Sequence, residues 1–95
     1  MRWYISAAAV KRWQAIAGYP IESDGESFDR AERELADLVN SARLSKDIGP
    51  GQQSQIWIVK ATVRGKRTRL EFAVSTDRRQ EGDLPQLINI RNKGA

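Results

Sequence analysis

The sequence contains no cysteine and no histidine among its 95 residues. The absence of cysteine excludes disulfide bonds and thiolate nucleophiles, and the absence of both excludes the usual zinc sites and imidazole acid–base catalysis. Any catalysis must therefore use Lys, Arg, Asp, Glu, Tyr, Ser or Thr side chains. We expect neither a bound metal nor a cofactor.

The sequence also lacks a hydrophobic run that approaches the length of a membrane span, and residues 1–6 lack the apolar stretch and cleavage site of a signal peptide. These absences predict a cytoplasmic protein that makes no membrane contact. A chain of 95 residues is long enough for one modest hydrophobic core, which predicts a single domain over residues 1–95.

Charge is present in quantity but is unevenly distributed, with 16 basic and 12 acidic residues and a formal net charge of +4. Residues 1–20 carry three bases and no acid, residues 21–47 carry eight acids against four bases, and residues 48–95 carry nine bases against four acids. This distribution predicts two faces of opposite sign. A basic face is typical of a nucleic-acid-binding protein.

The beginning of the chain has the pattern of a strand followed by a helix. Residues 2–5 alternate and are aromatic or β-branched, which predicts a short strand. Residues 7–17 carry an apolar stripe at helical spacing, with Ser6 in the position of an N-cap and Gly18 in the position that ends a helix.

A second helix is predicted over about residues 28–45. Apolar side chains recur there every three or four residues from Phe28 to Ala42. Ser27 stands where an N-cap is expected. The outer face of this helix has mixed charge, which is typical of a solvated surface.

The second half of the chain has the pattern of three strands. Residues 55–76 form two β-rich runs that flank a tight turn built on Arg64, Gly65, Lys66 and Arg67, which predicts a hairpin. Residues 84–92 predict a last strand with Ile88 and Ile90 toward the core. The order strand, helix, helix, strand, strand, strand predicts an α+β fold, with two helices packed on one face of an antiparallel sheet and the other face partly open.

This order of elements resembles the RelE/ParE superfamily of small toxins from bacterial toxin–antitoxin systems. The resemblance extends from Trp3 to Arg91 and also rests on Lys11-Arg12-Trp13 in the first helix and on the end of the hairpin at residues 70–74. Many members of that superfamily cleave messenger RNA, often on the ribosome and without metal, whereas the ParE branch inhibits DNA gyrase. The resemblance implies that basic residues on the sheet act on the scissile phosphate.

Strand alternation places four candidate catalytic residues on the outward face of the sheet: Lys60, Arg69, Glu71 and Arg91. A carboxylate at position 71 would accept a proton from the ribose 2′-OH, while the cations would stabilise charge on the phosphorane. The same residues also fit ordinary cross-strand charge pairs on a half-solvated strand face.

Other outward residues are candidates for binding partners. Six basic residues are predicted to contact phosphates: Arg64, Lys66, Arg67, Arg78, Arg79 and Lys93. An alternative interpretation of the Gly-Lys-Arg segment is a hairpin tip that is simply soluble. Ile56 and Ile58 are apolar on the outward face and would mark contact with an antitoxin or another protein if they are exposed.

Two functions are therefore consistent with the sequence. The first is a metal-independent endoribonuclease toxin that cleaves messenger RNA and has RNA or the ribosome as its partner. The second is a non-enzymatic inhibitor or binding module, such as a gyrase-type inhibitor or a small phage or mobile-element protein that binds a host protein or nucleic acid.

Overall fold

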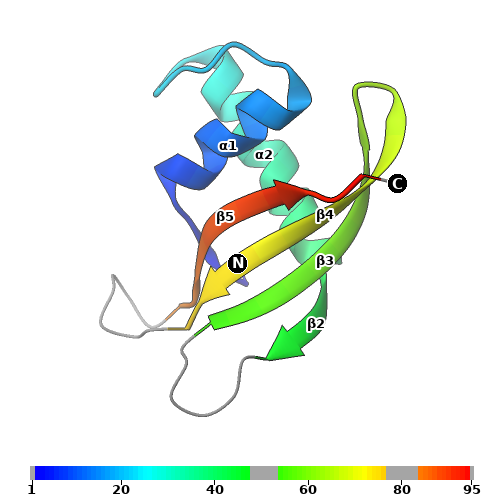
Figure 1. Cartoon of the computed structure of the whole chain (residues 1–95). Helices are drawn as coiled ribbons and strands as arrows, with labels where there is room; N and C mark the ends of the chain where they lie inside the picture. The colour runs from blue at the N-terminus through cyan, green and yellow to red at the C-terminus, as the bar shows by residue number, and fades with distance from the viewer. Residues whose placement is uncertain (1, 48–53, 77–83, 95) are drawn as a thin grey trace.

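The computed structural model describes residues 2–47, 54–76 and 84–94. Two helices pack against a five-stranded sheet in this part of the chain (Figure 1), so the predicted α+β class is confirmed. The elements in chain order are β1 (Tyr4–Ile5), α1 (Ala7–Ala17), α2 (Glu26–Ser41), β2 (Arg43–Asp47), β3 (Ser54–Val63), β4 (Lys66–Ser75) and β5 (Gln86–Asn92).

The strands are arranged in the order β1-β5-β4-β3-β2. Three of the four strand pairs are antiparallel, but β1 pairs in parallel with β5. The predicted antiparallel sheet is thus confirmed for three of the four strand pairs, and the parallel pair at this edge is the exception. A parallel pair needs a long connection, and the two helices and the other strands lie between β1 and β5 in the chain.

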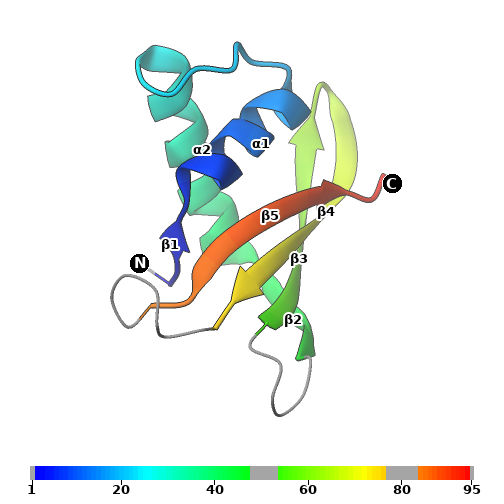
Figure 2. The same ribbon diagram turned by 60° about the vertical axis from the view of Figure 1, so that its left-hand side comes forward.

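Both helices lie on the same face of the sheet, as Figure 2 shows. The core between the two layers is formed by buried side chains from both: Val10, Trp13, Leu35 and Val39 from the helices, and Val59, Leu70, Phe72 and Ile90 from the strands. The Trp3 ring packs edge-on against Trp57 and Phe72, with centroids 5.0 and 6.1 Å apart. No helix in the described part of the chain covers the opposite face.

The ends of α1 follow the signals in the sequence. The Ser6 hydroxyl accepts a hydrogen bond from the Ala9 amide at 3.1 Å, and Gly18 ends the helix with a left-handed φ of 81°. Both assignments are confirmed. Glycine suits the second position because it has no Cβ to clash in the left-handed region.

The boundaries predicted for α2 are wrong at both ends. The helix begins at Glu26 after Gly25, and the Ser27 hydroxyl donates to the Pro20 carbonyl instead of capping the helix. The helix stops at Ser41, after which residues 43–47 form β2 on the edge of the sheet. The apolar helical stripe also ends at Ala42, so pairing with β3 replaces a helix that would bury nothing further.

A β-bulge changes which residues of β5 face the core. Val74 pairs with Leu87 and Ala73 pairs with Asn89, which leaves Ile88 as the additional residue. Leu87 is fully buried, whereas Ile88 is 44% exposed. The prediction that Ile88 faces the core is therefore wrong, and the prediction for Ile90 is confirmed.

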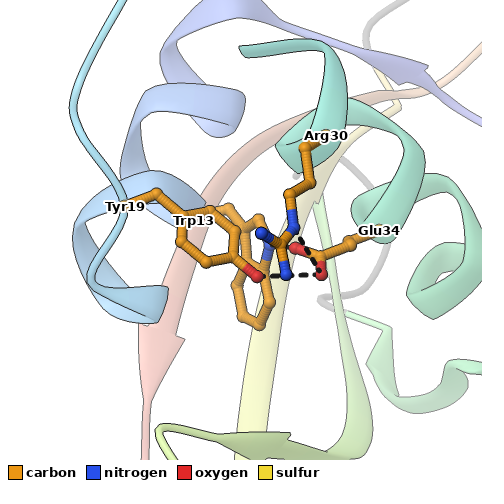
Figure 3. Close-up of polar contacts among 4 residues, drawn as sticks. All are labelled: Trp13, Tyr19, Arg30 and Glu34. Atoms are coloured by element: carbon orange, nitrogen blue, oxygen red, sulfur yellow. Dashed lines mark hydrogen bonds and ion pairs between the residues drawn. The ribbon is translucent and has the colours of Figure 1, made fainter. Parts of the chain in front are cut away.

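Glu34 joins the two helices through a polar cluster (Figure 3). Its carboxylate accepts hydrogen bonds from the Trp13 indole at 3.1 Å and from the Tyr19 hydroxyl at 2.9 Å. The Arg30 side chain approaches the same carboxylate at 3.8 Å and lies 4.8 Å from the Tyr19 ring centroid. Burial and then the hydrogen bond to Glu34 raise the pKa of Tyr19 above its ordinary value of 10.0.

We expect Glu34→Ala to lower the free energy of unfolding by about 1–2 kcal/mol, because the buried Trp13 indole and the Tyr19 hydroxyl lose their acceptor. Urea unfolding followed by tryptophan fluorescence measures the change. Glu32→Ala removes an exposed carboxylate from the same helix and is expected to change stability by less than about 0.5 kcal/mol. Equal losses for the two variants would contradict a role for the cluster in joining the helices.

Candidate nucleic-acid interface

The face of the sheet that the helices leave uncovered is strongly basic. Trp57, Val59, Ala61 and Val63 of β3 pack toward the helices, so the alternate residues of β3 and their cross-strand partners face the other way. This face, called the open face below, carries seven basic residues: Arg43, Lys46, Lys60, Arg67, Arg69, Arg91 and Lys93.

Glu71 is the one acidic residue that the register places on the open face in the described ranges. On the helical side, negative charge gathers along α2. Seven acidic residues lie in α2 and in the loop before it, where the basic residues are Arg30 and Arg33: Glu22, Asp24, Glu26, Asp29, Glu32, Glu34 and Asp37. The basic open face and the acidic α2 therefore lie on opposite sides of the sheet, as the distribution of charge along the sequence predicts.

The four residues predicted to be catalytic are neighbours on the open face. Lys60 lies directly opposite Arg69 on β4, and Glu71 lies directly opposite Arg91 on β5. Arg69 and Glu71 are two residues apart on one strand and therefore share a face. Cβ atoms of directly opposed residues are about 4.5–5.5 Å apart, so the two side chains of each pair are close neighbours.

Glu71 is partly buried between Ile58 on β3 and Arg91 on β5. It forms no ion pair with its basic neighbours in the described structure, where the one salt bridge joins Arg30 and Glu34. The carboxylate has basic residues as strand neighbours, Arg91 opposite and Arg69 two residues away, but no direct ion pair with either of them. This arrangement leaves its oxygens available to accept a proton or a hydrogen bond from a ligand.

A hollow of about 460 Å³ adjoins the open face beside β3. The basic residues Arg43, Lys60, Arg67 and Arg69 line it, together with Ser41 and Ile58. No acidic side chain contributes to its wall among the described residues. Four cations around one concave surface raise the local concentration of anions.

The residues predicted to contact phosphates separate into three groups. Arg67 and Lys93 lie on the open face, opposite Thr62 and Arg69 respectively. Lys66 pairs with Val63 and so lies on the helical side. Arg78 and Arg79 are outside the described residues.

Arg64 has a structural role at the hairpin turn. Its Nε donates to the Ile16 carbonyl at 3.1 Å and its Nη2 donates to the Ala15 carbonyl at 3.0 Å, which caps the end of α1. Arg64 and Gly65 both have positive φ, of 50° and 80°, as a two-residue type I′ turn requires. The guanidinium of Arg64 is thus engaged by the fold on the helical side.

Ile56 and Ile58 are partly buried on the open face. Lys46 lies opposite Ile56 and Arg43 lies opposite Ile58, so the aliphatic stems of these two cations flank the isoleucines. Arg43 and Lys46 are site residues that the sequence does not predict, because the second helix is predicted to continue to about residue 45. The end of the apolar helical stripe at Ala42 is the signal in the sequence that the helix stops before these residues.

None of the three tryptophan rings lies on the open face, since Trp3 and Trp13 are buried and Trp57 packs on the core. The basic residues of this face would hold a ligand by charge and by hydrogen bonds to its backbone. No group of three or more His, Cys, Asp or Glu side chains that could hold a metal is present within residues 2–47, 54–76 and 84–94. In the same ranges no helix is long and apolar enough to cross a membrane.

The fold and this face define a small α+β domain whose uncovered sheet surface is cationic. No protein-family model, curated protein or solved structure shows a significant match to the chain. The resemblance to RelE/ParE toxins therefore stays a prediction. Function has to be argued from the chemistry of the open face.

Proposed function

We propose that the open face binds single-stranded RNA through its phosphates and that Glu71 and its basic neighbours cleave the RNA chain. The observation that carries this proposal is the composition of the face, with seven basic residues around one carboxylate on a surface that the helices leave uncovered. Phosphate contacts dominate the affinity of nucleic-acid binding, and they need cations arranged along an accessible surface.

In the proposed reaction, the Glu71 carboxylate accepts the proton of a ribose 2′-OH. The 2′-oxygen then forms a bond to phosphorus, and the bond from phosphorus to the 5′-oxygen breaks. The products are a 2′,3′-cyclic phosphate and a 5′-hydroxyl, whose proton comes from water on this solvent-open face. Lys60, Arg69 and Arg91 stabilise the negative charge that grows on the phosphorane oxygens. The reaction requires the 2′-OH and therefore RNA.

Binding without cleavage is a second function that one observation favours. No side chain of the described structure holds the Glu71 carboxylate by an ion pair, whereas general bases are usually positioned by a neighbouring group. In this case the domain would act as a non-enzymatic inhibitor or binding module that occupies an anionic surface. Cleavage of messenger RNA distinguishes the two functions.

We expect Arg69→Ala to weaken binding of a fluorescein-labelled single-stranded RNA of about 20 nucleotides, which exceeds the usual site size of one small domain. Loss of one phosphate contact should reduce the slope of log affinity against log salt by about 0.7. Fluorescence anisotropy at several salt concentrations measures both quantities. Arg69 is suited to this test because its side chain is exposed and its backbone bonds to β5 do not depend on the side chain.

Arg33→Ala is the matched control, because it removes an exposed arginine from the helical side of the molecule. It should leave the salt slope unchanged. If the two arginine variants have the same effect, attraction depends on net charge alone and the open face is not the binding site.

A further inference from the structure

The outer edge of β3 is only partly paired. β2 pairs with β3 from Arg43 opposite Ile58 to Asp47 opposite Gln55. β2 begins at Arg43, directly after the C-cap of α2 at Ala42, so it does not extend farther along β3. Residues 59–63 of β3 therefore have a strand partner on the β4 side alone within the described ranges.

The direction of the backbone groups on this edge follows from the hydrogen bonds of β4. The Arg69 amide donates to the Gly94 carbonyl at 2.6 Å, and the Lys93 amide donates to the Arg69 carbonyl at 2.9 Å. Both backbone groups of Arg69 thus point toward β5, so its pair with Lys60 is a non-hydrogen-bonded one. The N–H and C=O of Lys60 point outward from the sheet, and by alternation those of Thr62 do too.

Toward the other edge of the sheet, side chains at the N-cap of α1 and within α1 bond two carbonyls of β5. The Ser6 hydroxyl donates to the Leu87 carbonyl at 3.0 Å, and the Arg12 guanidinium donates to the Ile90 carbonyl at 3.2 Å. No comparable side chain reaches Lys60 or Thr62 in the described structure. Unpaired strand edges are templates for the addition of another strand.

The charges beside this edge decide what kind of strand fits. Arg43, Lys60 and Arg67 line the hollow there, and no described acidic side chain does. A second copy of the chain would bring the same cations together across the new pair, which is unfavourable. A segment with acidic side chains on this face of the sheet would instead meet an opposite charge at each position.

We propose that the edge of β3 at Lys60–Thr62 accepts an extended acidic segment of a partner protein, which adds to the sheet as a strand. The backbone of Lys60 and Thr62 provides the hydrogen bonds, and alternate acidic side chains of the segment lie against Arg43, Lys60 and Arg67. This interaction goes beyond the proposed function, because its ligand is a protein segment held through the backbone of the sheet edge.

The probe is a peptide of about six residues with alternating glutamate and valine, a usual strand length, and its counterpart with lysine in place of glutamate. Two-dimensional NMR of the labelled protein should show the Lys60 and Thr62 amides shifting with the acidic peptide and exchanging with solvent at least about tenfold more slowly. The lysine peptide should not bind.

Thr62→Pro removes an outward N–H without changing charge or a bond to β4, and it should weaken binding of the acidic peptide at least about fivefold. Thr62→Val keeps the N–H and should bind as the wild type does. A peptide N-methylated at alternate positions gives an independent test on the wild-type protein, and it should lose binding in the register that points its methyl groups at β3.

Unchanged binding by both Thr62→Pro and the N-methylated peptide would overturn the proposal, as would amide shifts confined to Arg91 and Lys93. If sedimentation shows that the wild type is a dimer and that Thr62→Pro is not, the edge binds a second copy of the chain instead.

The RNA affinity of Thr62→Pro, measured by anisotropy, should equal that of the wild type. Peptide binding without RNA binding would reject only the proposed function, and RNA binding without peptide binding would reject only strand addition.

Discussion

Arg2→Ala is expected to lower the free energy of unfolding by about 2–3 kcal/mol, which is a large effect for one exposed side chain. Arg2 Nη1 donates to the Val39 carbonyl at 3.0 Å and to the Ala42 carbonyl at 2.7 Å. These carbonyls belong to the C-terminal end of α2, whose partial negative charge favours a cation. The guanidinium also lies 4.9 Å from the Trp57 ring centroid. Urea unfolding measures the loss.

Two further variants separate these contributions. Arg2→Lys keeps the positive charge but not the planar fork, so we expect roughly half of the loss. Lys11→Ala removes an exposed base from α1 and should change stability by less than about 0.5 kcal/mol. A loss for Arg2→Ala no greater than for Lys11→Ala would show that the contacts at the end of α2 contribute little.

Glu71→Gln is expected to reduce RNA cleavage by about 10²–10⁴-fold while RNA affinity is retained or slightly increased. Glutamine has nearly the same shape as glutamate but does not accept a proton from the 2′-OH. The substitution also removes the one negative charge on the described part of the open face. Single-turnover cleavage of messenger RNA, with and without ribosomes, measures the rate, and anisotropy measures the affinity.

Glu32→Gln changes the same functional group on the helical side and should cleave as the wild type does. Arg69→Ala should also lose cleavage, since it removes a cation next to Glu71. If the wild type cleaves no RNA under any of these conditions, the endoribonuclease hypothesis is wrong and binding alone remains. If Glu71→Gln cleaves normally, a different base is required.

The sequence predicts best those features that depend on neighbouring residues. Ser6 and Gly18 bound α1 because a cap acts on the adjacent turn. The hairpin register is also local: a two-residue turn at Arg64 and Gly65 pairs Val63 with Lys66, and counting back along the strands pairs Lys60 with Arg69. Half of the predicted catalytic group therefore follows from the turn.

The remaining features depend on contacts between residues far apart in the chain. Arg91 is placed opposite Glu71 by the pairing of β5, whose bulge at Ile88 no local signal reveals. β2 forms because β3 offers it an edge, which competes with the helical propensity of residues 43–45. Arg64 at the hairpin turn bonds the Ile16 carbonyl at the end of α1, 48 residues earlier in the chain, which only the folded structure brings near.

The separation of charge between the two layers also has a consequence for encounter. With α2 acidic and the open face basic, the molecule has an electric dipole that runs through the sheet. The field of a polyanion exerts a torque on this dipole that turns the open face toward the polyanion before contact. Most collisions then begin in a useful orientation, so the association rate should fall steeply with ionic strength even though the net charge is only +4.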